Sequence, residues 1–167
     1  MLAIKNNTKL NAVILSLVLF SGLVYWIFTI TQTKNNFKEP VVYTLSDEKV
    51  LNPINAYKTI LLKKDSVVNG FFNPGFTKHK WWIYLNVPSQ VGDYLQIANP
   101  HINKIRIYTI HNEQPLLAYE SGDYFKFSKR VLSDPDFWFQ IPSLTSGLLV
   151  EVDKKGESLD LPIRLVA

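Results

Sequence analysis

The sequence predicts an all-β protein: an antiparallel jelly-roll β-sandwich preceded by one N-terminal transmembrane helix. Three observations favour this fold class. Apolar residues alternate with a period of two through most of the chain after Pro40. Pro, Gly, Asn and Asp interrupt these runs at short intervals, as turns between short strands do. Residues 12–30 form one uncharged apolar run, which is typical of a helix that crosses a membrane.

The apolar run is long enough for a bilayer. At about 1.5 Å per residue, a helix over residues 12–30 spans roughly 28 Å, close to the hydrocarbon thickness of about 30 Å. Lys5 and Lys9 precede it without an acidic residue, which favours a cytoplasmic tail at residues 1–11. No small-residue cleavage site follows the run, so an uncleaved anchor is predicted, with a cleaved signal sequence as the alternative. Uniform apolarity disfavours a buried helix of a soluble protein.

The rest of the chain divides into a linker and one domain. Polar residues 31–40 predict a short linker, and residues 41–167 predict one extracytoplasmic domain with its own core. Seven to nine short strands are expected. No long helical pattern lies between them, and this disfavours a parallel α/β sheet. Residues 47–56 would make a helical turn. The predicted strands lie at residues 41–45, 58–62, 81–87, 95–97, 105–109, 116–119, 137–141, 148–152 and 161–165.

The composition and motifs of the chain disfavour several classes of function. The net charge of +4 comes mostly from residues 1–40, so the domain is nearly neutral, which disfavours nucleic-acid binding. The chain has no cysteine, and its three histidines are far apart in sequence, so neither a metal site nor a cofactor is predicted. No nucleophile elbow or phosphate-binding loop is present, and the prediction is that the protein is not an enzyme. Asp134 and Asp136 are interpreted as a loop cap before a strand, in preference to a calcium or catalytic pair.

A series of short motifs follows Pro40 in a fixed order: Gly75-Phe76, 81–87, 95–100, 105–108, 121–123, 127–130, 137–139, 149–152 and 161–165. In this order the chain, over roughly residues 40–166, resembles the second type of extracellular sensor domain of bacterial seven-transmembrane receptors with diverse intracellular signalling modules. The resemblance implies a jelly-roll sandwich similar to carbohydrate-binding modules. It also implies ligand sensing outside the inner membrane, with the signal passed to a cytoplasmic module.

Two features depart from that family. Its members usually continue into seven membrane helices, whereas this sequence stops at Ala167. A fragment of a longer receptor, or a domain acting on a single anchor, would each explain this. The family also favours Arg two residues after the tryptophan aligned with Trp82, where this chain has Tyr84.

Side-chain parity separates two kinds of aromatic residue. Trp81, Phe137 and Phe139 are expected in the core. The opposite side of the strands carries Arg106, Gln140 and the rings of Trp82, Tyr84, Tyr108 and Trp138. If that side is exposed, flat rings would stack on sugar faces, and the polar groups would bind hydroxyls. The alternative is that this face packs on a helix, a second sheet or another protein.

Gly122-Asp123 is predicted to form a turn. Asp123 and Arg130 are the last candidate site residues, and they would either rim a groove or pair with each other. The predicted ligand-binding residues are therefore Trp82, Tyr84, Arg106, Tyr108, Asp123, Arg130 and Trp138. The predicted function is a ligand-sensing module of a bacterial inner-membrane receptor, with its domain in the periplasm or outside the cell. It would bind a carbohydrate-like or other small polar ligand and act on a downstream membrane or signalling module. A membrane-anchored assembly protein without a ligand is the alternative, and a carbohydrate-active enzyme is the least favoured.

Overall fold

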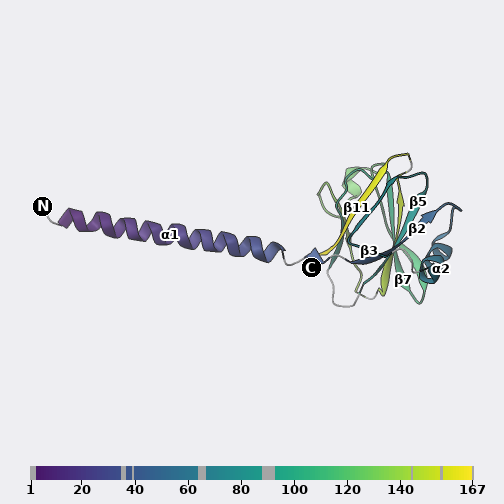
Figure 1. Ribbon diagram of the computed structural model, residues 1–167, viewed down its shortest axis with the longest axis horizontal. Coiled ribbons are helices and arrows are strands. Elements are labelled where there is room, and N and C mark those ends of the chain that lie inside the picture. The colour runs from purple at the N-terminus through teal and green to yellow at the C-terminus, as the bar shows by residue number, and fades with distance from the viewer. Residues whose placement is uncertain are drawn as a thin grey trace. The chain divides into compact units, whose positions relative to one another are not determined.

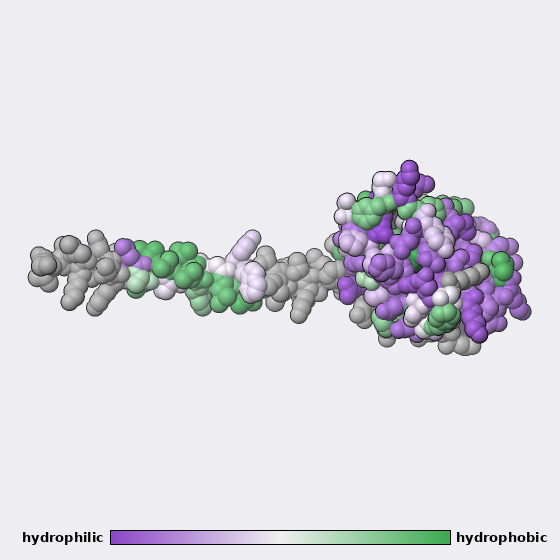
Figure 2. Space-filling model, turned by 90° about the horizontal axis from the view of Figure 1, so that it is seen from above, coloured by the Kyte–Doolittle hydropathy of each residue, from purple (hydrophilic) through white to green (hydrophobic). Residues whose placement is uncertain are grey.

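The computed structural model describes residues 3–34, 37–38, 40–63, 67–87, 93–143, 145–154 and 156–166. The chain divides into two compact units, Met1–Asn36 and Phe37–Ala167. The first contains helix α1, Ala3–Lys34. Apolar side chains gather along the described part of α1, whereas the visible face of the second unit is mostly hydrophilic (Figure 2).

Helix α1 contains the whole apolar run. The predicted linker, residues 31–40, holds the last residues of α1 and strand β1, Phe37–Lys38. Within the described residues, no helix has both the length and the apolarity that a membrane crossing requires. The membrane anchor and the cytoplasmic tail therefore stay predictions.

The second unit contains two antiparallel sheets. The larger sheet has the strand order β3-β2-β5-β10-β7-β8. Its strands are β2 Val41–Asp47, β3 Val67–Asn69, β5 Lys80–Asn86, β7 Lys104–His111, β8 Gln114–Ser121 and β10 Gly147–Asp153. The smaller sheet has the order β1-β11-β6-β9, with β4 also paired to β11. Its other strands are β4 Phe71–Phe76, β6 Tyr94–Ile97, β9 Phe137–Gln140 and β11 Ser158–Val166. The predicted all-β antiparallel sandwich is confirmed.

The main core lies between the two sheets. Ile83 and Leu85 alternate along β5 and are fully buried there, and Phe137 and Phe139 on β9 reach the same core from the smaller sheet. Trp81 packs against this cluster. The predicted core side of these strands is therefore confirmed. We call the face of the larger sheet that is turned away from this core its outer face.

One predicted strand is wrong. Residues 58–62 belong to helix α2, Pro53–Lys63, which lies against the larger sheet (Figure 1). Asn52 caps the helix, since its Oδ1 accepts a hydrogen bond of 2.9 Å from the amide of Asn55. Pro53 suits the first helical position because it lacks an amide hydrogen. The helix buries Ala56, Tyr57 and Ile60, a spacing that places all three on one face.

Candidate functional site

The outer face of the larger sheet carries side chains in rows that run across the strands. Tyr43, Tyr84, Leu149 and Tyr108 occupy one row on β2, β5, β10 and β7. The next row contains Leu45, Trp82, Glu151, Arg106 and Glu120. Four predicted site residues, Trp82, Tyr84, Arg106 and Tyr108, therefore share one face, as their parity predicted.

Helix α2 covers the aromatic part of this face. Ala56, Tyr57 and Ile60 form a second buried cluster with the rings of the sheet. Trp82 is only 1% exposed and Tyr108 only 6%. The prediction that these rings form an exposed docking floor is wrong. The physical reason is that the segment assigned to a strand is a helix, and its apolar face packs on them. The alternative, a face packed on a helix, is what the structure shows.

The buried rings have partners for their polar atoms. Trp82 Nε1 donates a hydrogen bond of 2.9 Å to Asp47 Oδ2, and the Tyr108 hydroxyl donates one of 3.1 Å to Glu151 Oε2. Burial raises the pKa of Tyr108 to about 12, and the charge of Glu151 adds to this effect. Burial likewise raises the pKa of Tyr84 to about 12, with Tyr57 contributing. Both phenols are therefore neutral at physiological pH.

Beside the aromatic cluster, the outer face carries a network of opposite charges, in which Glu151 is buried and the other members are partly exposed. Glu151 accepts hydrogen bonds from Lys80 Nζ at 2.9 Å and from Arg106 Nη1 at 3.2 Å. Arg106 Nε donates to Glu120 Oε1 at 2.7 Å, and Lys104 Nζ lies 2.9 Å from the same oxygen. Lys104, followed by Arg106, lowers the pKa of Glu120. The hydrogen bond to Glu120 raises the pKa of Arg106. Arg106, predicted to bind a ligand, is thus held between two carboxylates.

A groove lies beside α2, where the helix meets β2 and β5. Its lining residues are Tyr43, Ile60, Leu61, Tyr84 and Asn86, and it encloses about 510 Å³, including space open to solvent. We call it the tyrosine groove. The rings of Tyr43 and Tyr84 have centroids 6.2 Å apart.

Gly147 makes room for the phenol of Tyr84 in this groove. A Cβ at Gly147 would lie 2.7 Å from the Tyr84 ring and hydroxyl, closer than real contacts allow. Of the predicted site residues, Tyr84 alone lines the groove. The sequence analysis did not identify Tyr43 as a site residue. Tyr43 alternates with Val42 in the predicted strand 41–45, and the pairing of β2 with β5 places it on the same face as Tyr84.

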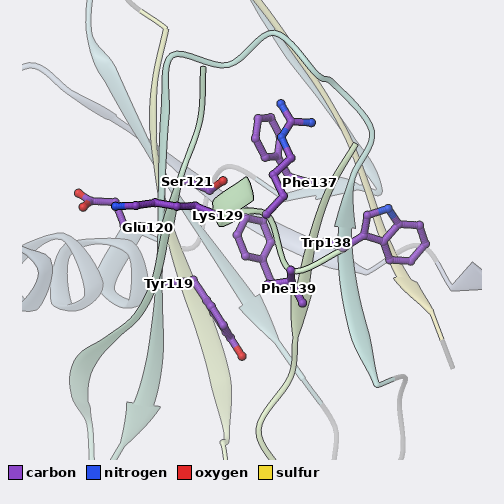
Figure 3. Close-up of a pocket in the computed structure, with 9 residues that line it drawn as sticks. Tyr119, Glu120, Ser121, Lys129, Phe137, Trp138 and Phe139 are labelled. Carbon is purple, nitrogen blue, oxygen red and sulfur yellow. The ribbon is translucent and has the colours of Figure 1, made fainter. Parts of the chain in front are cut away.

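A second pocket, the edge pocket, lies between the edge strands of the two sheets (Figure 3). It is lined by Tyr119, Glu120, Ser121, Lys129, Arg130, Val131, Phe137, Trp138 and Phe139. The indole of Trp138 points away from the rings of Phe137 and Phe139 (Figure 3). Trp138 pairs with Gln96 on the smaller sheet, so the structure does not bring it together with Trp82. Its buried Nε1 has no hydrogen-bond partner among the described residues.

Arg130 fixes the connection between β8 and β9, which includes the short helix η1, Phe127–Lys129. Its Nη2 lies 3.6 Å from Asp123 Oδ1, so these two predicted residues pair with each other. Its Nη1 donates to the carbonyl oxygens of Asp134, at 3.2 Å, and Pro135. The guanidinium also stacks 4.3 Å from the centroid of the Phe137 ring. Arg130 thus links the start of this connection, at Asp123, with its end, at Asp134 and Pro135.

The two other carboxylates of the connection cap the loop. Asp134 Oδ1 accepts a hydrogen bond of 2.8 Å from the amide of Asp136, and Asp136 Oδ2 accepts one of 2.8 Å from Gln96 Nε2. These bonds agree with the loop-cap interpretation. Over the described part of the chain, no group of three acidic or histidine side chains is arranged to hold a metal ion.

Fold and pockets define the second unit as a β-sandwich domain with surface grooves. Residues 59–167 match the family described as 7TMR-DISM extracellular 2, and the chain belongs to this family. The description names an extracellular domain of seven-transmembrane receptors, so the resemblance found in the sequence is confirmed. The sandwich is an extracellular sensing domain of a membrane-receptor family. A search among curated proteins finds no match.

Proposed function

We propose that residues 41–167 sense a small polar, saccharide-like ligand outside the membrane of a bacterial cell, as a binder and not as an enzyme. The family membership carries this proposal, because the family is described by an extracellular receptor domain. In the proposal the domain has the jelly-roll form of carbohydrate-binding modules, and α1 anchors it in the inner membrane. A signalling module in the cytoplasm would receive the output.

The tyrosine groove is the proposed ligand site. The rings of Tyr43 and Tyr84 supply an apolar floor, and Ile60 and Leu61 of α2 supply one wall. Asn86 is exposed at the end of β5 and adds an amide that both donates and accepts hydrogen bonds. An apolar floor with few polar groups is typical of small-molecule sites, and the C–H faces of a pyranose would stack on the phenol rings.

The groove also suggests how binding would be transmitted. Its walls come from α2 on one side and from β2 and β5 on the other. A ligand shifts a conformational equilibrium only by as much as its affinities for the two states differ. A saccharide that contacts both walls would favour one position of α2 on the sheet, and that difference would be the signal.

Ligand titration of the full chain tests the proposal. A panel of neutral mono- and oligosaccharides is titrated while tryptophan fluorescence and Tm are followed. Tyr43→Ala and Asn86→Ala are each expected to weaken binding about tenfold, equivalent to about 1.4 kcal/mol. Asn103→Ala, which lies outside the groove, is the matched control and is expected to bind like the wild type. No saturable response to any saccharide, or equal weakening by the control, would contradict the proposal.

One observation favours the alternative, an assembly protein without a ligand. Strand β8 is an edge of the larger sheet, and its Leu117 is 57% exposed. Edge strands with apolar side chains are suited to pairing with another chain. Self-association of the full chain that Leu117→Lys abolishes, together with a silent saccharide titration, would support this function.

A further inference from the structure

The smaller sheet also has a face that is turned away from the core. Core residues such as Leu95 on β6, Phe137 on β9 and Leu161 on β11 point inward, so the residues that alternate with them lie on the opposite face. This face includes Tyr94, Gln96, Trp138, Gln140, Asp160 and Arg164. Helix α2 packs on the larger sheet, and no described helix of the second unit packs on β6, β9 or β11. We call this uncovered face of the smaller sheet the open face.

Buried polar atoms without a partner are concentrated on the open face. Among the described residues, three buried side-chain atoms have no hydrogen-bond partner, and all three belong to this face: Gln96 Oε1, Trp138 Nε1 and Asp160 Oδ1. The larger sheet differs, because its buried Trp82 and Tyr108 donate hydrogen bonds to Asp47 and Glu151. A buried polar group without a partner lowers stability and is rare in folded proteins. Three of them on one face therefore indicate that a partner is supplied from outside.

The orientation of the Gln96 amide is fixed. Gln96 is only 6% exposed, and its Nε2 donates a hydrogen bond of 2.8 Å to Asp136 Oδ2. The amide of Asp136 is in turn held by Asp134 Oδ1 at 2.8 Å. Reversing the Gln96 amide would place two oxygens against each other, so its Oε1 stays turned away from Asp136. Gln96 is thus a preorganised acceptor that lacks a donor.

An aromatic surface lies beside this acceptor. Trp138 is directly opposite Gln96 on the neighbouring strand, and its indole points away from the rings of Phe137 and Phe139 (Figure 3). The Tyr94 ring meets the indole edge to face, with centroids 6.3 Å apart. The open face therefore combines two flat rings, an unpaired donor and an unpaired acceptor.

The third unpaired atom lies further along the same face. Arg164 of β11 pairs with Gln96, and Asp160 precedes it by four residues, which corresponds to roughly 13 Å along a strand. The three atoms are thus spread over more than the length of one sugar ring. An extended ligand is needed to meet all of them.

The missing partners define the chemistry of that ligand. Gln96 Oε1 and Asp160 Oδ1 need a donor, and Trp138 Nε1 needs an acceptor. An ammonium group has no acceptor, whereas a carboxylate has no donor and would be repelled by Asp160. A hydroxyl group both donates and accepts, so it suits all three atoms. A neutral chain of hydroxylated rings, whose C–H faces lie against Trp138 and Tyr94, is therefore complementary to the open face.

We propose that the open face binds an extended neutral oligosaccharide, whose hydroxyl groups pair with Gln96, Trp138 and Asp160. Trp138 and Asp160 are half-buried, so rotation of their own side chains brings the unpaired atoms to the surface. The site lies on the other sheet from the tyrosine groove. The inference rests on the extracellular location of the domain and not on that groove.

Calorimetric titration of the full chain with neutral hexasaccharides of glucose, mannose or galactose tests this inference. All proteins carry Tyr43→Ala, so that the tyrosine groove contributes little. At least one hexasaccharide is expected to bind, and its monosaccharide to bind at least about tenfold more weakly because it meets fewer of the unpaired atoms. The fully O-methylated hexasaccharide has no donors and is expected not to bind.

Trp138→Phe and Trp82→Phe form a matched pair of variants. Trp138→Phe removes an N–H without a partner, and is expected to weaken hexasaccharide binding about tenfold without lowering Tm. Trp82→Phe removes an N–H that is paired with Asp47, and is expected to lower Tm by several degrees and leave binding unchanged. Asp160→Ala is the second test, expected to weaken binding without lowering Tm, and Glu48→Ala, an exposed change, is its control.

Several results would overturn the inference. They are no binding of any hexasaccharide, equal binding of the O-methylated form, equal weakening by Trp138→Phe and Trp82→Phe, or a lowered Tm with unchanged binding in both Trp138→Phe and Asp160→Ala. Saccharide binding to the wild type that Tyr43→Ala abolishes would refute this inference and support the tyrosine groove. Binding that survives Tyr43→Ala and is lost with Trp138→Phe would do the reverse, so the two proposals fail separately.

Discussion

The two faces of the larger sheet are both buried, but for different reasons. Ile83 and Trp82 are neighbours on β5, and neither is more than 1% exposed. Ile83 packs between the two sheets, whereas Trp82 packs under α2 and donates its indole hydrogen to Asp47. The inner face is covered by a whole sheet through apolar contacts, to which Phe137 and Phe139 contribute from the smaller sheet. The outer face is covered by one eleven-residue helix, and its rings require specific polar partners.

This difference has a consequence for function. A face covered by a second sheet changes only when the domain unfolds, because its strands share one core. A face covered by a single helix loses its cover when that helix moves, and only three residues of α2, Ala56, Tyr57 and Ile60, are buried. The tyrosine groove lies where this smaller contact ends. Ligand-dependent change is therefore expected on the outer face.

The largest expected effect comes from the inner face. Ile83→Ala leaves a cavity between the sheets and is expected to lower the free energy of unfolding by about 2–5 kcal/mol. Chemical denaturation of the full chain, followed by tryptophan fluorescence and circular dichroism, measures this change. Both probes should shift together, because the inner core is shared by all strands. Val41→Ala, at an exposed position of β2, is the control and should change stability by no more than about 0.5 kcal/mol. A small or probe-dependent effect of Ile83→Ala would show that the inner face is not the common core.

The outer face is expected to respond less and more locally. Trp82→Phe keeps an aromatic ring but removes the hydrogen bond to Asp47, and is expected to cost about 1–3 kcal/mol because the carboxylate loses a buried donor. Hydrogen exchange should show faster exchange in α2 than in β10.

A double-mutant cycle with Asp47→Ala isolates the bond, because Asp47 also accepts a hydrogen bond from the amide of Leu51. We expect a coupling energy of at least about 0.5 kcal/mol. Additive single effects would mean that the indole contributes by packing alone.

The strands were predictable because parity is a local property. The alternation along residues 81–87 separates Trp82 from Ile83 whatever lies on either side. What covers each face is a tertiary property. The outer face is covered by helix α2, and residues 58–62 of this helix were predicted as a strand. This segment has five residues, of which three are apolar, and it is too short for its periodicity to distinguish a strand from a buried helix. The start signal of Asn52 followed by Pro53 was the available evidence for the helix.

Side-chain parity predicted one part of the candidate site correctly, and the order of the strands, which parity does not give, accounts for the errors. Parity grouped Trp82, Tyr84, Arg106 and Tyr108 correctly on one face. It grouped Trp138 with them wrongly, because β9 belongs to the other sheet. The observed pairing of Asp123 with Arg130 is one of the two alternatives predicted from the turn at Gly122-Asp123. Gln96 and Tyr43 were missed, since their roles depend on which strands become neighbours. Strand order is not encoded in the period of any single strand.

The smallest effect is expected in the charged part of the outer face. Glu120 has a pKa below its ordinary value of 4.5, chiefly because Lys104 and then Arg106 donate hydrogen bonds to it. A lowered pKa in the folded protein means that the stabilisation is present above the unfolded pKa, and is lost as pH falls through the folded pKa. Glu120→Gln is therefore expected to cost about 0.2–1 kcal/mol at pH 7, as partly exposed ion pairs do. The difference from the wild type should shrink below about pH 4.5 and vanish once the wild-type carboxyl is protonated. Urea denaturation at a series of pH values measures the difference, and Glu48→Gln, an exposed change outside the network, controls for the loss of one negative charge. A difference that stays constant with pH would show that Glu120 stabilises the sheet without its charge, and the two parts of the outer face would then be held by the same kind of contact.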